Sequence, residues 1–372
     1  MSGGNPFGGA EKFAVELLRN LDRSLFSARV LVPLDNAVAD RFRAIDVPVH
    51  VIPLARGRDV TNLPRFLALL DEHHVGLVNA HGVRGGFYAA LARRVRPIKV
   101  VVVEHNLQPW RARTLPRALD RLTANNNDVR IGVSQSIVDD MVSAGVIRRE
   151  RTRMIPCGVD MPRFAVDAPR RERARAKLGI GAEELMVLAA GRLHPMKGFI
   201  DLVNAVPRII ERVPRARIIV AGEGEERPAL EKRIAELHAG DAIRLTGYLP
   251  DVPELFAAAD VFVLPSVAIP GLPQEGTPLA IEEAGAAGLP VVTTRISGNA
   301  EIIRDGFNGR VVDPQNSGQL ADAIIDVLRN PERMKMGENG KRIVTERYSL
   351  EYVVNAYTDV FLDLLEGDQR RR

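Results

Sequence analysis

The chain has 372 residues, 46% of them hydrophobic and 26% charged, which suggests two globular domains and excludes disordered and fibrous classes. A single cysteine excludes an intrachain disulfide and a thiolate metal cage, and no signal sequence or membrane-spanning stretch is recognisable, so we expect a cytoplasmic protein. Residues 1–180 carry 29 Lys and Arg against 18 Asp and Glu, a net charge of +11, whereas the remainder carries 22 against 29, a net charge of −7.

The basic first half indicates an anionic partner, for which a phosphorylated substrate and an acidic membrane face are the leading candidates. A solvated, arginine-rich surface is the alternative. Nucleic acid is the weakest candidate, because the sequence shows no platform of interleaved aromatic and basic residues.

The chain begins in an unusual way for a parallel α/β fold, in which a strand normally feeds the first glycine-rich turn. Gly8 and Gly9 form a turn that leads into a helix with apolar Phe13, Leu17 and Leu18, but the seven residues before it do not have the pattern of a strand. We therefore expect the natural chain to begin upstream of Met1.

Short β-branched runs alternate with helical stretches along the chain, a pattern typical of parallel sheets with crossover helices. It predicts an α/β protein of two Rossmann-like, doubly wound domains, 1–165 and 178–346, followed by a last segment 347–372. The arginine-rich stretch 161–177 has little apolar periodicity and is expected to be the linker. The expected strands are 28–34, 49–54, 76–81, 99–105, 129–134 and 153–157, and then 185–191, 216–222, 243–247, 261–265, 291–294 and 309–312.

Two helices are well marked. After Gly198, apolar residues at helical spacing form one stripe over 199–213. Ser349 is the expected N-cap of a last helix whose apolar face includes Val353 and Tyr357.

The loop after the strand at 185–191 reads Gly191-Arg-Leu-His-Pro-Met-Lys197-Gly. Ligands of open α/β sheets bind at the carboxyl ends of strands. Lys197 lies next to a helix N-terminus, which disfavours a cation, so we expect an anionic ligand to compensate. Arg192 and Lys197 are suited to hold a diphosphate together. Two surface cations in a loop are the alternative.

Glu275 and Glu283 bracket the start of a short helix. Thr277 is its expected N-cap and Pro278 its first residue, so Glu275 precedes the helix and Glu283 lies inside it. The free N–H groups of such a helix start suit phosphate, and the carboxylates are suited to accept hydrogen bonds from sugar and ribose hydroxyls. Because this spacing is common by chance, two solvated glutamates are the plainer alternative.

Three further features are weaker signals. The turn at Gly222 and Gly224 has acidic neighbours that would repel phosphate, so it is either a simple turn or a contact for a neutral base or ribose. His81 and His105 end two strands of the first domain, and ordinary strand-end polar residues are the alternative there. Metal and acyl-transfer chemistry lack a supporting motif.

The ordered set of motifs resembles the retaining glycosyltransferase family four, which has the GT-B architecture of two facing Rossmann-like domains with a last helix that crosses back to the first. The resemblance extends over nearly the whole chain. Its matching segments are Gly8-Gly9-Ala10-Glu11, Ala80-His81-Gly82, 131–134, 155–160, Gly191-Arg192, Lys197-Gly198, Gly247-Tyr248, Glu275 and Glu283-Ala284.

The resemblance implies transfer of a sugar from a nucleotide-diphosphate donor, without a cofactor or an essential metal, to a glycan or lipid-linked acceptor in cell-surface polysaccharide or glycolipid synthesis. The basic first domain would take the acceptor, with peripheral association at the inner membrane face, and the leaving phosphate would assist deprotonation of the acceptor. The implied catalytic residues are His81, Arg192, Lys197 and Glu275, and the implied donor-binding residues are Gly8, Gly9, Gly191, Gly224, Tyr248, Leu249, Thr277, Leu279 and Glu283.

Within this resemblance, Arg192 and Lys197 would bind the diphosphate and stabilise the departing nucleotide. Glu275 would hold the donor sugar, Glu283 the ribose, and His81 would lie beside the reaction centre. Cys157 stands where the family usually has Asn, a departure that affects hydrogen bonding of the local loop. A GT-B sugar-nucleotide epimerase and a non-catalytic nucleotide-sugar-binding protein are the alternatives, which product analysis distinguishes.

Overall fold

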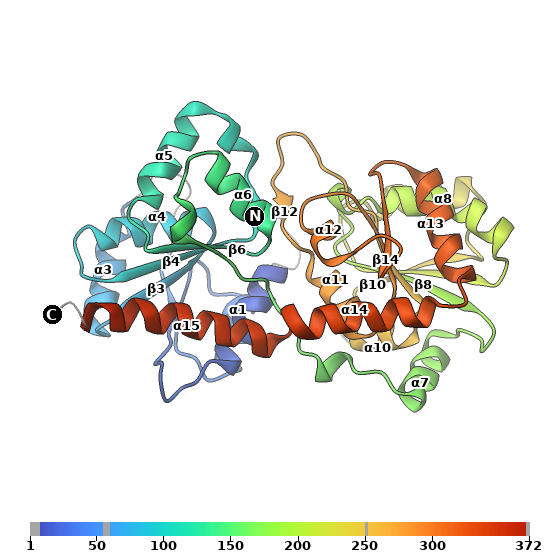
Figure 1. Ribbon diagram of the computed structural model, residues 1–372, viewed down its shortest axis with the longest axis horizontal. Coiled ribbons are helices and arrows are strands. Elements are labelled where there is room, and N and C mark those ends of the chain that lie inside the picture. The colour runs from blue at the N-terminus through green and yellow to red at the C-terminus, as the bar shows by residue number, and fades with distance from the viewer. Residues whose placement is uncertain (1–7, 55–59, 250–251, 370–372) are drawn as a thin grey trace. The chain divides into compact units, whose positions relative to one another are not determined.

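The protein folds into two compact units, shown in the computed structural model of Figure 1, which describes residues 8–54, 60–249 and 252–369. The first unit is formed by the described residues up to Cys157 and from Leu350 onward, and the second by Gly158–Ser349. The seven residues on which the expectation of an upstream start rests lie outside the described residues. No helix in the described part is long and apolar enough to cross a lipid bilayer.

The first unit is built on parallel strands. Its main sheet has the order β3-β4-β6-β7, and β1 pairs separately with β2, also in parallel. The centre of the main sheet is apolar on both faces, since Val100 to Val103 are fully buried. The strands of this unit are β1 (Val30–Val32), β2 (Val49–Val51), β3 (Leu77–His81), β4 (Lys99–Glu104), β5 (Asn106–Leu107), β6 (Val129–Gly132) and β7 (Thr152–Met154).

Helices cover both faces of the main sheet, with α4, α5 and α6 on one side and α15 on the other (Figure 1). The last helix, α15, packs on α1 through aromatic side chains: the rings of Phe13 and Tyr357 are 5.6 Å apart. The expected return of the last helix to the first unit is therefore confirmed. The helices are α1 (Gly9–Asn20), α2 (Ala37–Arg43), α3 (Leu63–Glu72), α4 (Gly82–Arg93), η1 (Pro109–Ala112), α5 (Thr114–Ala124), α6 (Gln135–Ser143), η2 (Arg149–Arg151) and α15 (Leu350–Gln369).

The second unit contains a parallel six-stranded sheet of order β10-β9-β8-β11-β13-β14. Chain order runs outward from β8 in one direction to β10 and then restarts at β11 in the other, so the strand order reverses between β8 and β11. Crevices at such reversal points are where open α/β sheets bind ligands. The strands are β8 (Leu185–Ala190), β9 (Ala216–Ala221), β10 (Ile243–Gly247), β11 (Val261–Leu264), β12 (Gln274–Glu275), β13 (Val291–Thr294) and β14 (Gly309–Val312).

The helices of the second unit include α8, whose predicted apolar stripe is buried from Phe199 to Ile209. They are η3 (Pro162–Phe164), α7 (Ala168–Leu178), η4 (Pro195–Lys197), α8 (Phe199–Arg212), α9 (Arg227–Glu236), α10 (Val252–Ala258), α11 (Leu279–Ala286), α12 (Asn299–Ile302), α13 (Ser317–Arg329) and α14 (Arg333–Arg347). All expected strands are present in the two units, and β5 and β12, of two residues each, are additional.

The stretch predicted as a linker instead contains α7, which packs on α10 within the second unit. Its arginines anchor it: Arg171 and Arg175 both pair with Asp260, at 2.8 and 3.2 Å, and Arg170 pairs with Glu254 at 2.8 Å. The prediction was wrong because this helix is held by ion pairs and hydrogen bonds to backbone carbonyls, so it needs no apolar stripe.

Candidate active site

The loop that leaves β8 is interlocked with the loop that leaves β9. Gly191 has a φ of +155°, and its N–H donates to the carbonyl of Ala221 at 3.0 Å. A Cβ atom on Gly222 would lie 1.8 Å from the carbonyl oxygen of Gly191, and one on Gly224 would lie 2.2 Å from that of Leu193. Backbone packing therefore requires both glycines of the β9 turn, whether or not the turn also contacts a ligand.

Lys197 is placed at the strand-order reversal by two contacts of its neighbours. A Cβ on Gly198, whose φ is +65°, would meet the carbonyl of Pro265 at 2.0 Å, so the start of α8 packs directly on the end of β11. The N–H of Val267 donates to the carbonyl of Met196 at 2.8 Å. These contacts join the loops after β8 and β11 into one structural platform.

On this platform, the Nζ of Lys197 donates to Oε2 of Glu275 at 2.5 Å. The lysine side chain is 14% exposed and the glutamate side chain 38% exposed, so the pair lies at the edge of the solvent. Oε1 of Glu275 makes no hydrogen bond within the described residues and is available to a ligand hydroxyl. A small hollow beside the pair is lined by Met196, Ser266, Val267, Gln274, Glu275, Pro278, Ile296, Ser297 and Asn299.

His194 lies among the charged groups of the site. Desolvation and the positive charge of Arg192 lower the pKa of His194, while Glu225 and Glu275 oppose that lowering. Its Nδ1 accepts a hydrogen bond from the N–H of Met196 at 3.1 Å. The sequence analysis assigns His194 no role, although its place in the chain between the two candidate cations was a usable signal.

Helix α11 positions the second carboxylate. The helix begins at Leu279 with Pro278 as its N-cap, so the predicted N-cap role of Thr277 was wrong by one residue. The extended ψ of 122° at Pro278 keeps that residue outside the helix. Glu283 is only 5% exposed, which rules out the solvated alternative for this residue, whereas Glu275 is partly exposed.

The loop after β10 also lies at the carboxyl ends of the strands, where the other predicted residues of this unit are found. The N–H of Gly222 donates to the carbonyl of Gly247 at 2.9 Å, which brings this loop next to the β9 turn. Tyr248 is 59% exposed, and Leu249 packs against the core. The predicted residues of the second unit thus gather at the carboxyl ends of four strands: Gly191, Arg192 and Lys197 after β8, Gly224 after β9, Tyr248 and Leu249 after β10, and Glu275, Thr277, Leu279 and Glu283 after β11.

In the first unit, His81 ends β3 and pairs with His105, with 3.0 Å between Nδ1 of His81 and Nε2 of His105. The ring of Phe13 on α1 lies 6.0 Å from each imidazole. Desolvation lowers the pKa of His81 to about 4, and desolvation together with the charge of His81 lowers the pKa of His105 to about 3. Both imidazoles are therefore neutral at pH 7 and act as hydrogen-bonding groups.

Buried Cys157 lies next to this half-buried histidine pair, with its Sγ 3.9 Å from Nδ1 of His105. The thiol, which stands where the family usually has an asparagine side chain, thus takes part in the hydrogen bonding of its loop.

The two glycines at the start of α1, the N-cap Gly8 and the first helical residue Gly9, are exposed. The N–H of Gly8 is satisfied by Oε2 of Glu11 at 3.0 Å. A Cβ on Gly9 would meet nothing within 4 Å, so packing among the described residues gives no reason for a glycine there.

Two findings concern other sites. A larger hollow of about 610 Å³ beside α9 and β10 is lined by none of the predicted site residues. The candidate site is therefore the charged cluster at the reversal of strand order, and not this hollow.

Within the described residues, no group of three or more His, Cys, Asp or Glu side chains has an arrangement that could hold a metal ion.

Comparison with known proteins identifies the family. Residues 170–343 match the family model described as glycosyl transferases group 1, and residues 7–163 match Glycosyltransferase Family 4. A GDP-mannose-dependent alpha-(1-6)-phosphatidylinositol monomannoside mannosyltransferase of Mycobacterium tuberculosis is 32% identical over 91% of this chain and 87% of its own length. The chain is a family 4 glycosyltransferase.

Other relatives of this glycosyltransferase are more distant in sequence. The UDP-Gal:alpha-D-GlcNAc-diphosphoundecaprenol alpha-1,3-galactosyltransferase of Escherichia coli is 24% identical over 90% of this chain and 87% of its own. The crystal structure of Anabaena HepE in complex with UDP superposes with a TM-score of 0.82 at 23% identity, covering 97% of both chains. A glycosyltransferase from Rickettsia africae has a TM-score of 0.83 at 17% identity, covering 96% of this chain and 95% of its own.

The glycosyltransferase therefore has the GT-B fold, and it is a retaining enzyme that moves a sugar from a nucleotide-diphosphate donor to a glycan or lipid-linked acceptor. The curated relatives named here are transferases, which does not favour the epimerase or the non-catalytic alternative.

Proposed function

We propose that the second unit binds the donor at the platform formed by the loops after β8 and β11. The observation that carries this proposal is the ion pair of Lys197 with Glu275 at the reversal of strand order, with Arg192 earlier in the same loop after β8. A lysine held beside a carboxylate, with an exposed arginine in the same loop, suits a diphosphate that is joined to a sugar.

In this proposal the two cations stabilise negative charge on the donor. Arg192 and Lys197 hold the diphosphate and stabilise the charge that develops on it as the sugar departs, so no metal ion is required. Glu275 keeps Lys197 oriented through Oε2 and accepts hydrogen bonds from donor-sugar hydroxyls through Oε1. Buried Glu283 accepts from the ribose hydroxyls. The leaving phosphate takes the proton of the acceptor hydroxyl.

The first unit contributes the acceptor side. His81 is neutral at pH 7, so its role at the reaction centre is to hydrogen-bond a hydroxyl and not to supply charge. The basic surface of this unit attracts an anionic acceptor or the membrane surface that carries it.

The donor base and sugar are tested by ligand-induced stabilisation. We expect one of UDP, GDP and ADP to raise the melting temperature, since binding to the native state alone stabilises by about 2.7 kcal/mol at a hundredfold excess over Kd. The named relatives use UDP-galactose and GDP-mannose, so UDP and GDP are tested first. The shift should be lost in an R192A/K197A variant. No shift with any nucleotide, or an equal shift in the variant, would contradict the proposed donor site.

A further inference from the structure

The single tryptophan of the chain, Trp110, lies in the first unit in the short helix η1, which follows β4 and β5. It comes five residues after His105, whose imidazole pairs with that of His81. Its side chain is half-buried. Ligand sites are lined mainly by apolar and aromatic side chains, and a tryptophan offers the largest ring surface among them. Trp110 is therefore a candidate ligand contact on the side of the histidine pair.

The indole is oriented so that carbon surface is left to the solvent. Its polar atom is satisfied within the loop, because Nε1 donates to Oε1 of Gln108 at 2.9 Å. The guanidinium of Arg111 lies over the ring, 5.3 Å from its centroid. Since the side chain of Arg111 is only 1% exposed, the ring face that it covers is the inner one. The outer part of the ring offers apolar surface and no hydrogen-bond donor.

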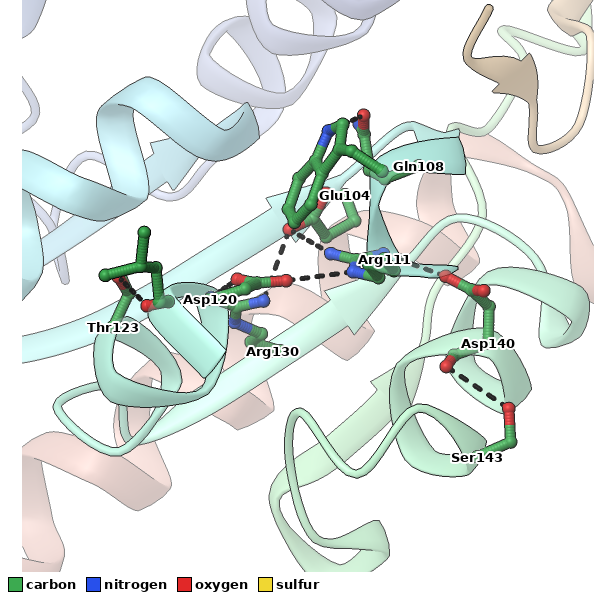
Figure 2. Close-up of polar contacts among 10 residues, drawn as sticks. Glu104, Gln108, Arg111, Asp120, Thr123, Arg130, Asp140 and Ser143 are labelled. Atoms are coloured by element: carbon green, nitrogen blue, oxygen red, sulfur yellow. Dashed lines mark hydrogen bonds and ion pairs between the residues drawn. The ribbon is translucent and has the colours of Figure 1, made fainter. Parts of the chain in front are cut away.

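A buried network of ion pairs fixes Arg111 against the indole (Figure 2). Its guanidinium donates to Asp120 at 2.9 Å, to Asp140 at 3.0 Å and to Glu104 at 3.1 Å. Removing one partner from a buried ion pair is strongly unfavourable, so movement of this guanidinium is resisted. The ring that packs on it is thereby restrained within the chain itself, and a restrained aromatic side chain loses little entropy on binding.

The charge of this network favours a neutral ligand. Arg130 joins the network by pairing with Asp120 at 2.8 Å, so two guanidiniums meet three carboxylates. The formal net charge of the groups behind the indole is therefore −1, which does not attract a phosphate to the ring.

Amide side chains precede the ring. The NH₂ group of Gln108 makes no hydrogen bond within the described residues, and the side chain of Asn106 makes none there either. Asn106 begins β5, and Gln108 has extended dihedral angles, so the two side chains point to the same side of an extended segment. A ring surface next to unused amide groups suits a ligand that has both an apolar face and hydroxyl groups.

We propose that Trp110 is a stacking platform for a neutral sugar ring of the acceptor. The C–H face of a pyranose packs on the electron-rich outer face of the indole, and its hydroxyls bond to the amides of Gln108 and Asn106. Trp110 thereby makes the enzyme select acceptors that present such a ring. The inference rests on the proposed function in one respect, the assignment of the acceptor to the first unit.

Intrinsic fluorescence tests the proposal directly, because Trp110 is the only tryptophan. The full chain is titrated, without donor, with the methyl α-glycosides of glucose, galactose, mannose and N-acetylglucosamine. At least one glycoside should change the tryptophan emission saturably, whereas sorbitol, which has no ring face, should not. No change with any of the four glycosides, or an equal change with sorbitol, would overturn the proposal.

Acceptor kinetics separate this role from a structural one. In transfer to the glycoside that binds, W110A should raise the KM for the acceptor about tenfold, a loss of about 1.4 kcal/mol of binding, and leave kcat within about twofold. W110F keeps an aromatic face and should recover most of the affinity. The matched control L115A, at a 66% exposed leucine of α5, should keep the wild-type KM.

Two kinetic outcomes would contradict the acceptor role of Trp110. One is a W110A variant with a lowered kcat and an unchanged KM for the acceptor. The other is a glycoside that changes the tryptophan emission but receives no sugar.

The platform and the donor site fail independently in these experiments. Stabilisation by the nucleoside diphosphate should be the same in W110A as in the wild type, because the proposed donor platform lies in the second unit. If no nucleotide stabilises the protein, the donor site is refuted, and the fluorescence titration still decides the role of Trp110. A change of emission with the nucleotide but with none of the glycosides would assign the ring to the donor and overturn the proposal.

Discussion

The ammonium group of Lys197 and the carboxylate of Glu275 meet at 2.5 Å, although they are 78 residues apart in the sequence. Each comes from the loop after a different strand, β8 and β11, at the point where the strand order of the second unit reverses. The lysine beside the start of α8 thus has a negative partner within the chain itself, which offsets its unfavourable position relative to the helix dipole.

Removing either candidate cation should impair the chemical step. We expect K197A and R192A each to lower kcat about 100-fold or more, because preorganised charge that stabilises a leaving group is worth roughly 3 kcal/mol. Steady-state transfer assays with the identified donor measure this effect. K232A, at an 80% exposed lysine of α9, is the matched control and should keep wild-type turnover. Unchanged kcat in both K197A and R192A would exclude the assigned role.

The two glutamates should separate sugar recognition from nucleotide recognition. We expect E275Q to weaken binding of the nucleotide sugar about tenfold relative to the free nucleoside diphosphate, since one charge-assisted hydrogen bond is worth about 1.5 kcal/mol or more. E283Q should weaken both ligands by a similar factor, because both contain the ribose. Calorimetric titration of each variant with both ligands checks this, and identical profiles for the two variants would refute the division of roles.

Stability should depend on pH through the histidine pair. The pKa values of His81 and His105 in the folded state, about 4 and about 3, lie below the ordinary value of 6.5. The unfolded chain therefore takes up protons first as the pH falls, and stability is lost progressively from about pH 6.5 toward pH 4. Urea denaturation across this range measures the slope, which should become shallower in H105Q. A stability that rises on acidification would contradict the lowered pKa values of the pair.

A buried ion-pair network in the first unit joins Arg111 to Glu104, Asp120 and Asp140 (Figure 2), and it should be sensitive to the loss of this arginine. R111M leaves Glu104 and Asp120 with fewer positive partners in the interior, so we expect the free energy of unfolding to fall by about 3–5 kcal/mol. R208M breaks a pair with Asp322 in which both side chains are 52% exposed, and it should cost at most about 1 kcal/mol. Equal effects in urea titrations would show that the network contributes no more than surface pairing.

Much of the fold followed from local pattern. The predicted strands match because their β-branched runs, such as Val100 to Val103, form the centre of parallel sheets and are buried on both faces. The buried apolar stripe of α8 was also predicted correctly from its helical spacing. Helix α7 was missed because arginine-to-carbonyl and arginine-to-carboxylate contacts hold it, and these partners lie more than 80 residues away in the sequence.

The sequence identified the candidate site residues, but it did not predict which of them contact one another. The motif placed Arg192 and Lys197 correctly after a strand, yet the pairing of Lys197 with Glu275 depends on which strand lies beside β8, and strand order is not encoded in local periodicity. The wrong N-cap at Thr277 has a similar origin, since the ψ angle of Pro278 decides where the helix begins. The network around Arg111 left no sequence signal at all, because each partner comes from a separate element.

The interlocked glycines at positions 222 and 224 have an evolutionary consequence. Any side chain at either position would collide with main-chain oxygens of the neighbouring loop, so neither site can accept a point mutation without moving both loops. Accepted substitutions in these loops are thereby confined to positions whose side chains have room, such as exposed Tyr248 on the adjoining loop.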